Sequence, residues 1–132
     1  MPNEIKSTFV LQFGLTQSEA FRVNVENGWW AERSMIRSIC QREGIDFRPH
    51  LAIELTGLHQ TELSEAIEAA RKHDPETWKD HTRPHTMVRE FAGAVIRIMD
   101  TCEYFGLPLA QAIEAEIEAN RTRGYMHGGK AA

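Results

Sequence analysis

The stretch LAIELTGLHQTELSEAIEAARK, residues 51–72, contains no proline and is rich in leucine, alanine and glutamate. These residue types favour an α-helix, and Pro49, just before them, suits the first turn of one. We therefore predict a long helix over 51–72. Apolar residues at steps of three and four predict a second long helix over 86–104, which ends at Gly106.

Shorter patterns on either side complete the expected fold. Helical spacing predicts further helices over 16–27, 34–43 and 109–121. Residues 7–13 alternate weakly between apolar and polar side chains and end at Gly14, a pattern that favours a short extended arm. Because no series of alternating strands is visible, the predicted class is all-α: a helical bundle, most simply antiparallel, behind an extended N-terminal arm.

The composition indicates a single domain. The chain has 132 residues, of which 42% are hydrophobic and 26% are charged, so it carries enough apolar material for one core and enough polar material to cover it. We assign residues 1–15 to the N-terminal arm, 16–124 to the all-α domain and 125–132 to a basic, glycine-rich C-terminal tail.

Charge and cysteine content narrow the function classes. The formal net charge of −4 gives no basic excess, so we expect no stable nucleic-acid binding. No apolar run approaches the roughly 20 residues that span a membrane, and Cys40 and Cys102 lack the spacing of a disulfide framework or a zinc site. Together these features predict a cytoplasmic protein with reduced cysteines and no membrane association.

The segment HDPETWKDHTRP, residues 73–84, predicts a loop, because it has two prolines and no periodicity. His73, His81 and His85 crowd this part of the chain in the manner of metal ligands. Pro84 interrupts the helical spacing between the last two histidines, so a solvated loop is the favoured interpretation over a metal site.

Acidic side chains interrupt an apolar stripe on the first long helix. Glu62 and Glu65 continue the line of Leu51 and Leu55 at steps of three and four residues. A carboxylate is costly to bury unless it is paired, neutralised or bound to a metal. Two carboxylates one turn apart can bind a divalent cation through oxygen. The alternative, equally open here, is a wet end of the bundle or pairing with arginines.

Polar residues on the second long helix also share a face. Glu90, Arg97 and Asp100 lie roughly opposite the stripe that contains Phe91 and Val95. On its own this is an ordinary solvated face. It becomes part of a site when another helix or a second subunit covers it.

Two further sets of residues have a functional and a structural interpretation. Trp29 and Trp30 can stack on a nucleobase, although tryptophans at such positions more often fill the core. Near the end of the last helix, the amide of Asn120 and the guanidinium of Arg123 can hold a base or a phosphate. Cations that complement the helix dipole explain that end equally well.

Four segments form an ordered set along the chain: GWW at 28–30, QTELSEAIEA at 60–69, REFAGAVIRIMD at 89–100 and NRTRGYMHGGK at 120–130. Taken in this order, they resemble the MazG-like all-α NTP pyrophosphohydrolases, in particular the short, single-domain type of phage and bacteria. The likeness covers about residues 21–130 and depends on the ordered set of segments. In that family an ExxE pair and an ExxD pair on successive helices hold magnesium.

The resemblance implies a metal site that lacks one ligand. The ExxE pair matches as Glu62 and Glu65, but Gly93 stands where the second motif, which begins at Glu90, has its aspartate. The implied metal and catalytic residues are therefore Glu62, Glu65 and Glu90, with Glu65 as the water activator. Asp100, two turns beyond Gly93, is a weak further metal ligand.

The resemblance also implies the substrate contacts. Trp30 is the expected base-stacking residue, and Asn120, Arg123 and Tyr125 match the end of the family sequence that contacts the nucleotide. Glu116 stands where the family usually has a lysine, which removes one expected phosphate contact.

The implied function is a Mg²⁺-dependent hydrolase, active with Mn²⁺ as well, that splits a nucleoside triphosphate into monophosphate and pyrophosphate. The implied assembly is a homodimer or tetramer in which helix pairs from two subunits complete a four-helix bundle. The alternative is a catalytically degenerate member that keeps nucleotide binding or an interaction role after the loss at Gly93.

Overall fold

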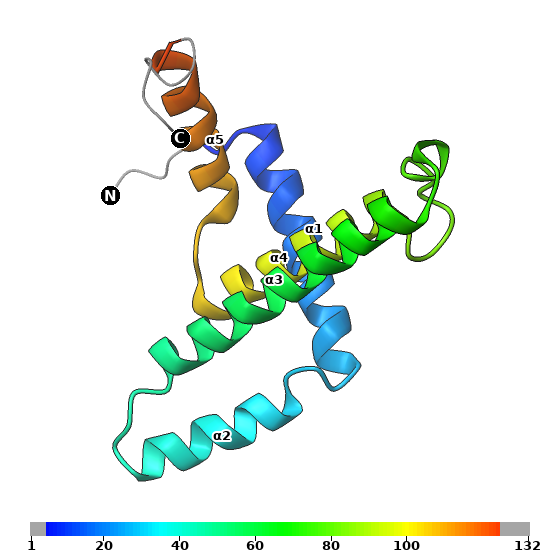
Figure 1. Cartoon of the computed structure of the whole chain (residues 1–132). Helices are drawn as coiled ribbons and strands as arrows, with labels where there is room; N and C mark the ends of the chain where they lie inside the picture. The colour runs from blue at the N-terminus through cyan, green and yellow to red at the C-terminus, as the bar shows by residue number, and fades with distance from the viewer. Residues whose placement is uncertain (1–4, 125–132) are drawn as a thin grey trace.

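The structure, a computed structural model, describes residues 5–124 and is all-α over that range. Five α-helices and one short 3₁₀ turn make up its regular structure, and the described residues contain no strand (Figure 1). The elements are α1 (Thr8–Glu26), α2 (Ala31–Arg42), α3 (Arg48–Lys72), η1 (Pro75–Thr77), α4 (Met87–Phe105) and α5 (Leu109–Thr122). The predicted fold class is confirmed.

The two long helices lie side by side and run in opposite directions (Figure 1). The long helix expected over 51–72 is confirmed as α3, with Pro49 in its first turn. The hydroxyl of Thr86 caps α4 by accepting the backbone N–H of Arg89. Gly106 ends α4 in the left-handed conformation, with φ of 68°. This antiparallel pair is the platform for the site described below.

The first helix corrects the expected N-terminal arm. Residues 8–13, which the alternation favours as extended, are helical. The Ser7 hydroxyl accepts the backbone N–H three residues on, which caps the helix. Phe9 and Phe13 are also one turn apart, and their ring centroids lie 5.4 Å from each other. Thr16, expected at the start of the helix, lies inside it.

The apolar core centres on Trp30, just before α2. Its side chain is buried against Leu51 and Leu55 of α3. Its ring stacks on Tyr104 with a centroid distance of 4.6 Å and an interplanar angle of 1°, and Phe21 of α1 lies 5.4 Å away. Aromatic and leucine side chains from α1, α3 and α4 therefore meet at one end of the α3–α4 pair.

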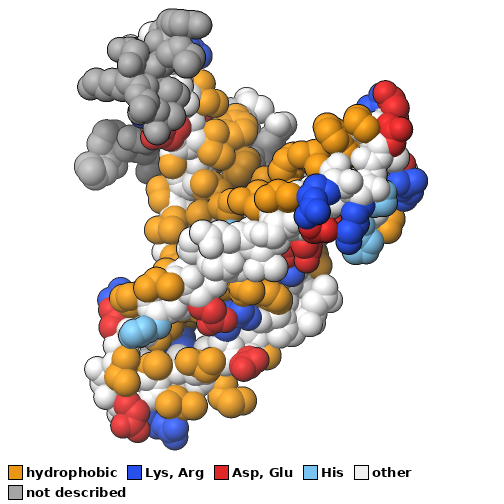
Figure 2. Space-filling model, viewed as in Figure 1, with side chains coloured by type: hydrophobic (Ala, Val, Ile, Leu, Met, Phe, Trp, Pro, Cys, Tyr) orange, Lys and Arg blue, Asp and Glu red, His pale blue; other side chains and the backbone are white. Residues whose placement is uncertain are grey.

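The remaining helices leave much apolar surface uncovered. The helix α1 packs across α4, α5 packs against α1, and α2 has no buried residue (Figure 1). Figure 2 shows hydrophobic side chains at the surface over α2 and along the α3–α4 pair. The most exposed of the large ones in these helices include Ile53 and Ile67 of α3, Phe91 and Val95 of α4, and Met35 of α2. The bundle completed by a second subunit stays a prediction.

None of the helices in residues 5–124 combines the length and the apolar character needed to cross a membrane. Tyr125 and the tail over 125–132 lie outside the described residues.

Candidate metal centre

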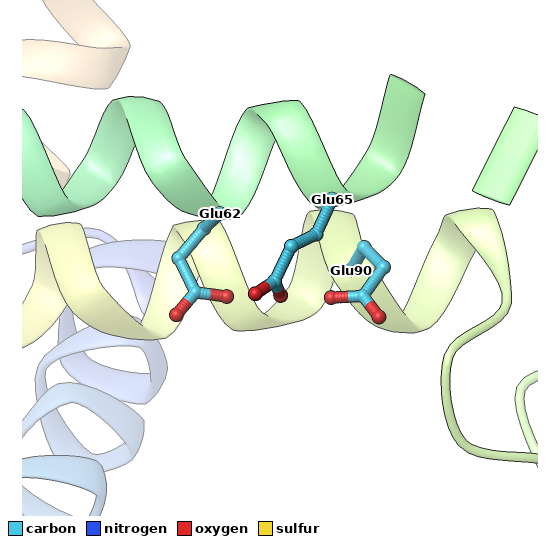
Figure 3. A group of neighbouring side chains, drawn as sticks. All are labelled: Glu62, Glu65 and Glu90. Carbon is cyan, nitrogen blue, oxygen red and sulfur yellow. The ribbon is translucent and has the colours of Figure 1, made fainter. Parts of the chain in front are cut away.

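Three carboxylates from the antiparallel pair converge on one side of it (Figure 3). Glu62 and Glu65 are one turn apart on α3, and Glu90 comes from the first turn of α4. One oxygen from each of the three lies within 4.8 Å of the other two. The helix period aligns the α3 pair, and the antiparallel packing brings Glu90 opposite it. We call these three residues the acidic cluster.

Like charges in the acidic cluster affect its protonation. The pKa of Glu65 is raised, chiefly because its carboxyl hydrogen-bonds that of Glu90, with desolvation and charge repulsion from Glu90 as further causes. His85 and Arg97 act in the opposite direction. A divalent cation among these oxygens would remove the repulsion, and an all-carboxylate donor set suits Mg²⁺ or Mn²⁺. The residues present therefore fit a hard divalent cation.

Two basic side chains lie beside the acidic cluster. The Arg97 Nε lies 3.5 Å from a Glu62 carboxylate oxygen, and the His85 Nδ1 lies 3.3 Å from one of Glu90. His85 is the exposed last residue before the α4 cap and has a φ of 66°, which is rare for a residue other than glycine. The two interpretations of these acids that need no metal are thus both present. Glu62 pairs with an arginine, and Glu65 is exposed to solvent.

Gly93 of α4 lies next to the Glu62 carboxylate. A Cβ placed at Gly93 would be 3.1 Å from a Glu62 oxygen, so any side chain there requires Glu62 to move by a few tenths of an ångström. The position at which the resemblance expects a fourth acid therefore faces the acidic cluster. The glycine removes that ligand and makes room for Glu62.

Asp100 does not join the acidic cluster, which corrects its expected role as a weak metal ligand. It lies ten residues after Glu90 on the same helix, about 15 Å along the axis. It is only 1% exposed and accepts a hydrogen bond from the Asn24 side chain of α1, while its other oxygen has no hydrogen-bond partner within residues 5–124. Burial raises its pKa, against the effects of the Asn24 bond and Arg97. Asp100 serves the α1–α4 contact.

The two neighbouring tryptophans have different surroundings. Trp30 is 5% exposed and stacked in the core, which corrects the expectation that its ring is open to a nucleobase. Trp29 instead contacts two guanidinium groups, whose carbons lie 3.7 Å (Arg97) and 4.6 Å (Arg33) from the centroid of its ring. Sequence reasoning missed the pairing of Trp29 with Arg97. The available signal was the position of Arg97 on the face that carries Glu90.

The expected nucleotide contacts of the last helix are separate from the acidic cluster within one chain. Asn120 and Arg123 are exposed at the C-terminal end of α5, which packs against α1. Phe105, the last residue of α4, lies fifteen residues after Glu90, about 22 Å along the axis, and α5 starts beyond that end of the helix. The single chain therefore does not bring Asn120 or Arg123 to the metal centre.

Comparison of the chain with protein-family models, with curated proteins and with solved structures found no match. The geometry of the site by itself offers oxygen ligands for a divalent cation, with an arginine beside them.

Proposed function

We propose that this protein is a Mg²⁺-dependent nucleoside triphosphate pyrophosphohydrolase, also active with Mn²⁺, that releases a nucleoside monophosphate and pyrophosphate. The observation that carries the proposal is the acidic cluster, whose oxygens lie within 4.8 Å of one another. The choice of reaction rests on the resemblance of four ordered segments to the MazG-like family. The geometry by itself supports the cation site.

Each residue of the acidic cluster has a role in this proposal. Glu62, Glu65 and Glu90 hold the cation through their carboxylate oxygens. Once bound, the cation would neutralise phosphate charge and lower the pKa of water. Glu65 would accept the proton of the attacking water, the role that the resemblance implies for it. Glu62 of α3 and Glu90 of α4 lie on either side of Glu65 (Figure 3).

The proposed assembly is a cytoplasmic homodimer or tetramer. The exposed apolar residues of α2, α3 and α4 support an oligomer, since a chain that stays alone rarely leaves so much apolar surface in water. Light scattering after size-exclusion chromatography tests the assembly, and a mass of 15.1 kDa would contradict it.

A catalytically degenerate protein is the second candidate, favoured by a specific contact. Arg97 pairs with Glu62 at 3.5 Å, and Gly93 leaves the acidic cluster one ligand short of the family pattern. In this candidate the arginine neutralises the acid in place of a metal, and the protein keeps nucleotide binding or an interaction role.

Pyrophosphate release separates the two candidates. We would test a panel of ribo- and deoxyribonucleoside triphosphates with Mg²⁺ or Mn²⁺, with Glu62→Gln as the blank. The matched control is Glu68→Gln, because Glu68 is on the same helix but pairs with Arg71. We expect Glu62→Gln to lower turnover by about 100-fold or more and Glu68→Gln to leave it unchanged. No turnover, with nucleotide still raising the melting temperature, would favour the degenerate protein.

A further inference from the structure

Arg97 is a cationic side chain beside the acidic cluster. It lies one turn after Gly93 and two turns after Glu90 on α4, so the three residues are on the same face of that helix. Its guanidinium lies over the Trp29 ring, with 3.7 Å between the guanidinium carbon and the ring centroid. Its side chain is 27% exposed, so the group is neither buried nor free in solvent. It stands where the metal centre meets the surface beside Trp29.

The contact between Arg97 and Glu62 is loose. The distance of 3.5 Å is longer than the roughly 2.8 Å of a charge-assisted hydrogen bond between such groups. Stacking on an indole engages the face of a guanidinium and leaves its in-plane N–H donors available. Trp29 therefore orients Arg97 without using the donors that an anion needs.

The charges at this site indicate a role for the N–H donors of Arg97. The acidic cluster carries up to three negative charges, and a triphosphate held there through a divalent cation adds more. A guanidinium beside such a site can bind phosphate oxygens and offset part of this charge. Once a divalent cation binds the Glu62 carboxylate, the attraction that holds Arg97 against it is weakened.

We propose that Arg97 is a polyphosphate-binding residue that rests on Glu62 in the empty site and transfers to the triphosphate when the divalent cation binds. The inference rests on the proposed function, since it assigns one more residue to the same site. Arg97 then has two opposite effects on binding. When no substrate is present, Arg97 competes with the cation for Glu62; when the triphosphate is present, Arg97 strengthens binding of the cation–triphosphate complex.

A second arginine on the same tryptophan provides a matched control. The Arg33 guanidinium carbon lies 4.6 Å from the centroid of the Trp29 ring, but its Nη1 donates to the Trp29 carbonyl at 3.0 Å and its Nη2 to Glu54 at 2.9 Å. Glu54 is outside the acidic cluster. Replacement of Arg33 therefore disturbs the stacking on Trp29 without removing a cation that reaches the cluster.

The test measures two binding constants for Arg97→Met, Arg97→Lys and Arg33→Met. The first is for Mn²⁺ alone, by electron paramagnetic resonance. The second is for inorganic tripolyphosphate at saturating Mn²⁺, by titration calorimetry, a probe that does not depend on the unknown base. We expect Arg97→Met to bind Mn²⁺ about threefold more tightly and tripolyphosphate about tenfold more weakly. Arg97→Lys should recover part of the tripolyphosphate binding, and Arg33→Met should match the wild type in both.

The outcomes separate this inference from the proposed function. If the wild-type protein binds no Mn²⁺, the proposed function fails and the inference fails with it. If the wild type binds both probes and Arg97→Met binds tripolyphosphate equally well, the inference alone is wrong. Melting temperatures of all variants identify any that do not fold, and Arg97→Lys then provides the test in place of Arg97→Met.

Discussion

The two ends of the α3–α4 pair are built from one helix stripe but differ in chemistry. At one end Leu51 and Leu55 of α3 pack against Trp30, which is stacked and buried. At the other end the stripe continues as Glu62 and Glu65, each of which has a carboxylate oxygen within 4.8 Å of one from Glu90. We call these regions the aromatic core and the acidic cluster. The aromatic core lowers the free energy of the folded chain, whereas repulsion between the carboxylates of the acidic cluster raises it.

The aromatic core should show the largest effect on stability. We expect Trp30→Ala to lower the free energy of unfolding by about 3–5 kcal/mol, because it removes a buried ring from between aromatic neighbours. Urea denaturation measures the change. The neighbouring Trp29→Ala is the control and should cost clearly less, since Trp29 is only partly buried. If both cost the same, Trp30 is not the centre of the core. Trp30→Phe replaces the alanine variant if that one does not fold.

The acidic cluster should respond in the opposite direction. We expect Glu90→Gln to leave the metal-free free energy of unfolding unchanged or higher, because it removes the repulsion with Glu65. The same substitution should weaken Mn²⁺ binding by about tenfold or more, since one of three ligands is neutralised. Saturating Mg²⁺ should then raise the melting temperature of the wild type and raise that of the variant much less. A variant that binds Mn²⁺ as the wild type does would place the metal elsewhere.

A new acid at Gly93 sharpens the contrast further. We expect Gly93→Asp to tighten Mn²⁺ binding by about tenfold and to raise turnover, because it restores a carboxylate beside Glu62. Without metal it should lower the free energy of unfolding by about 1 kcal/mol relative to Gly93→Asn, a variant of similar size without the charge. Denaturation in the presence and absence of Mn²⁺ measures both effects. No gain in affinity would favour the degenerate protein.

The smallest expected effect is on the pH dependence of stability. The pKa of Glu65 is raised in the folded chain, so the folded chain keeps this proton after the unfolded chain has lost it. The resulting stability is fully present below the ordinary carboxyl pKa and is lost as the pH rises through the folded value. We expect the free energy of unfolding of the metal-free wild type, relative to Glu65→Gln, to fall as the pH rises above about 4.5. A difference that increases with pH would contradict the raised pKa.

Much of the secondary structure could be predicted from local patterns. The long helices, their start near Pro49 and Thr86 and the end at Gly106 follow from composition, spacing and capping residues. Residues 8–13 show where this fails. Phe9 and Phe13 fit both an alternating strand and one turn of a helix, and the cap at Ser7 decides for the helix.

The candidate site could be predicted in its members and less well in its geometry. Glu62 and Glu65 are adjacent on any helix that contains them. Asp100 has the same type of side chain and shares the face of Glu90, yet it is buried against α1 and bonded to Asn24. Which helix each of these two acids meets depends on where the helices cross. The periodicity of the sequence does not contain that information.

The sequence by itself determined the all-α class, the long helices and the presence of carboxylates on their faces, because propensity, capping and the helix period act within a few residues. Only the tertiary structure decided that Glu90 meets the pair on α3, that Trp30 fills the core while Trp29 supports Arg97, and that Gly93 lies against the Glu62 carboxylate. These are contacts between segments distant in sequence, and they depend on how whole helices pack and cross.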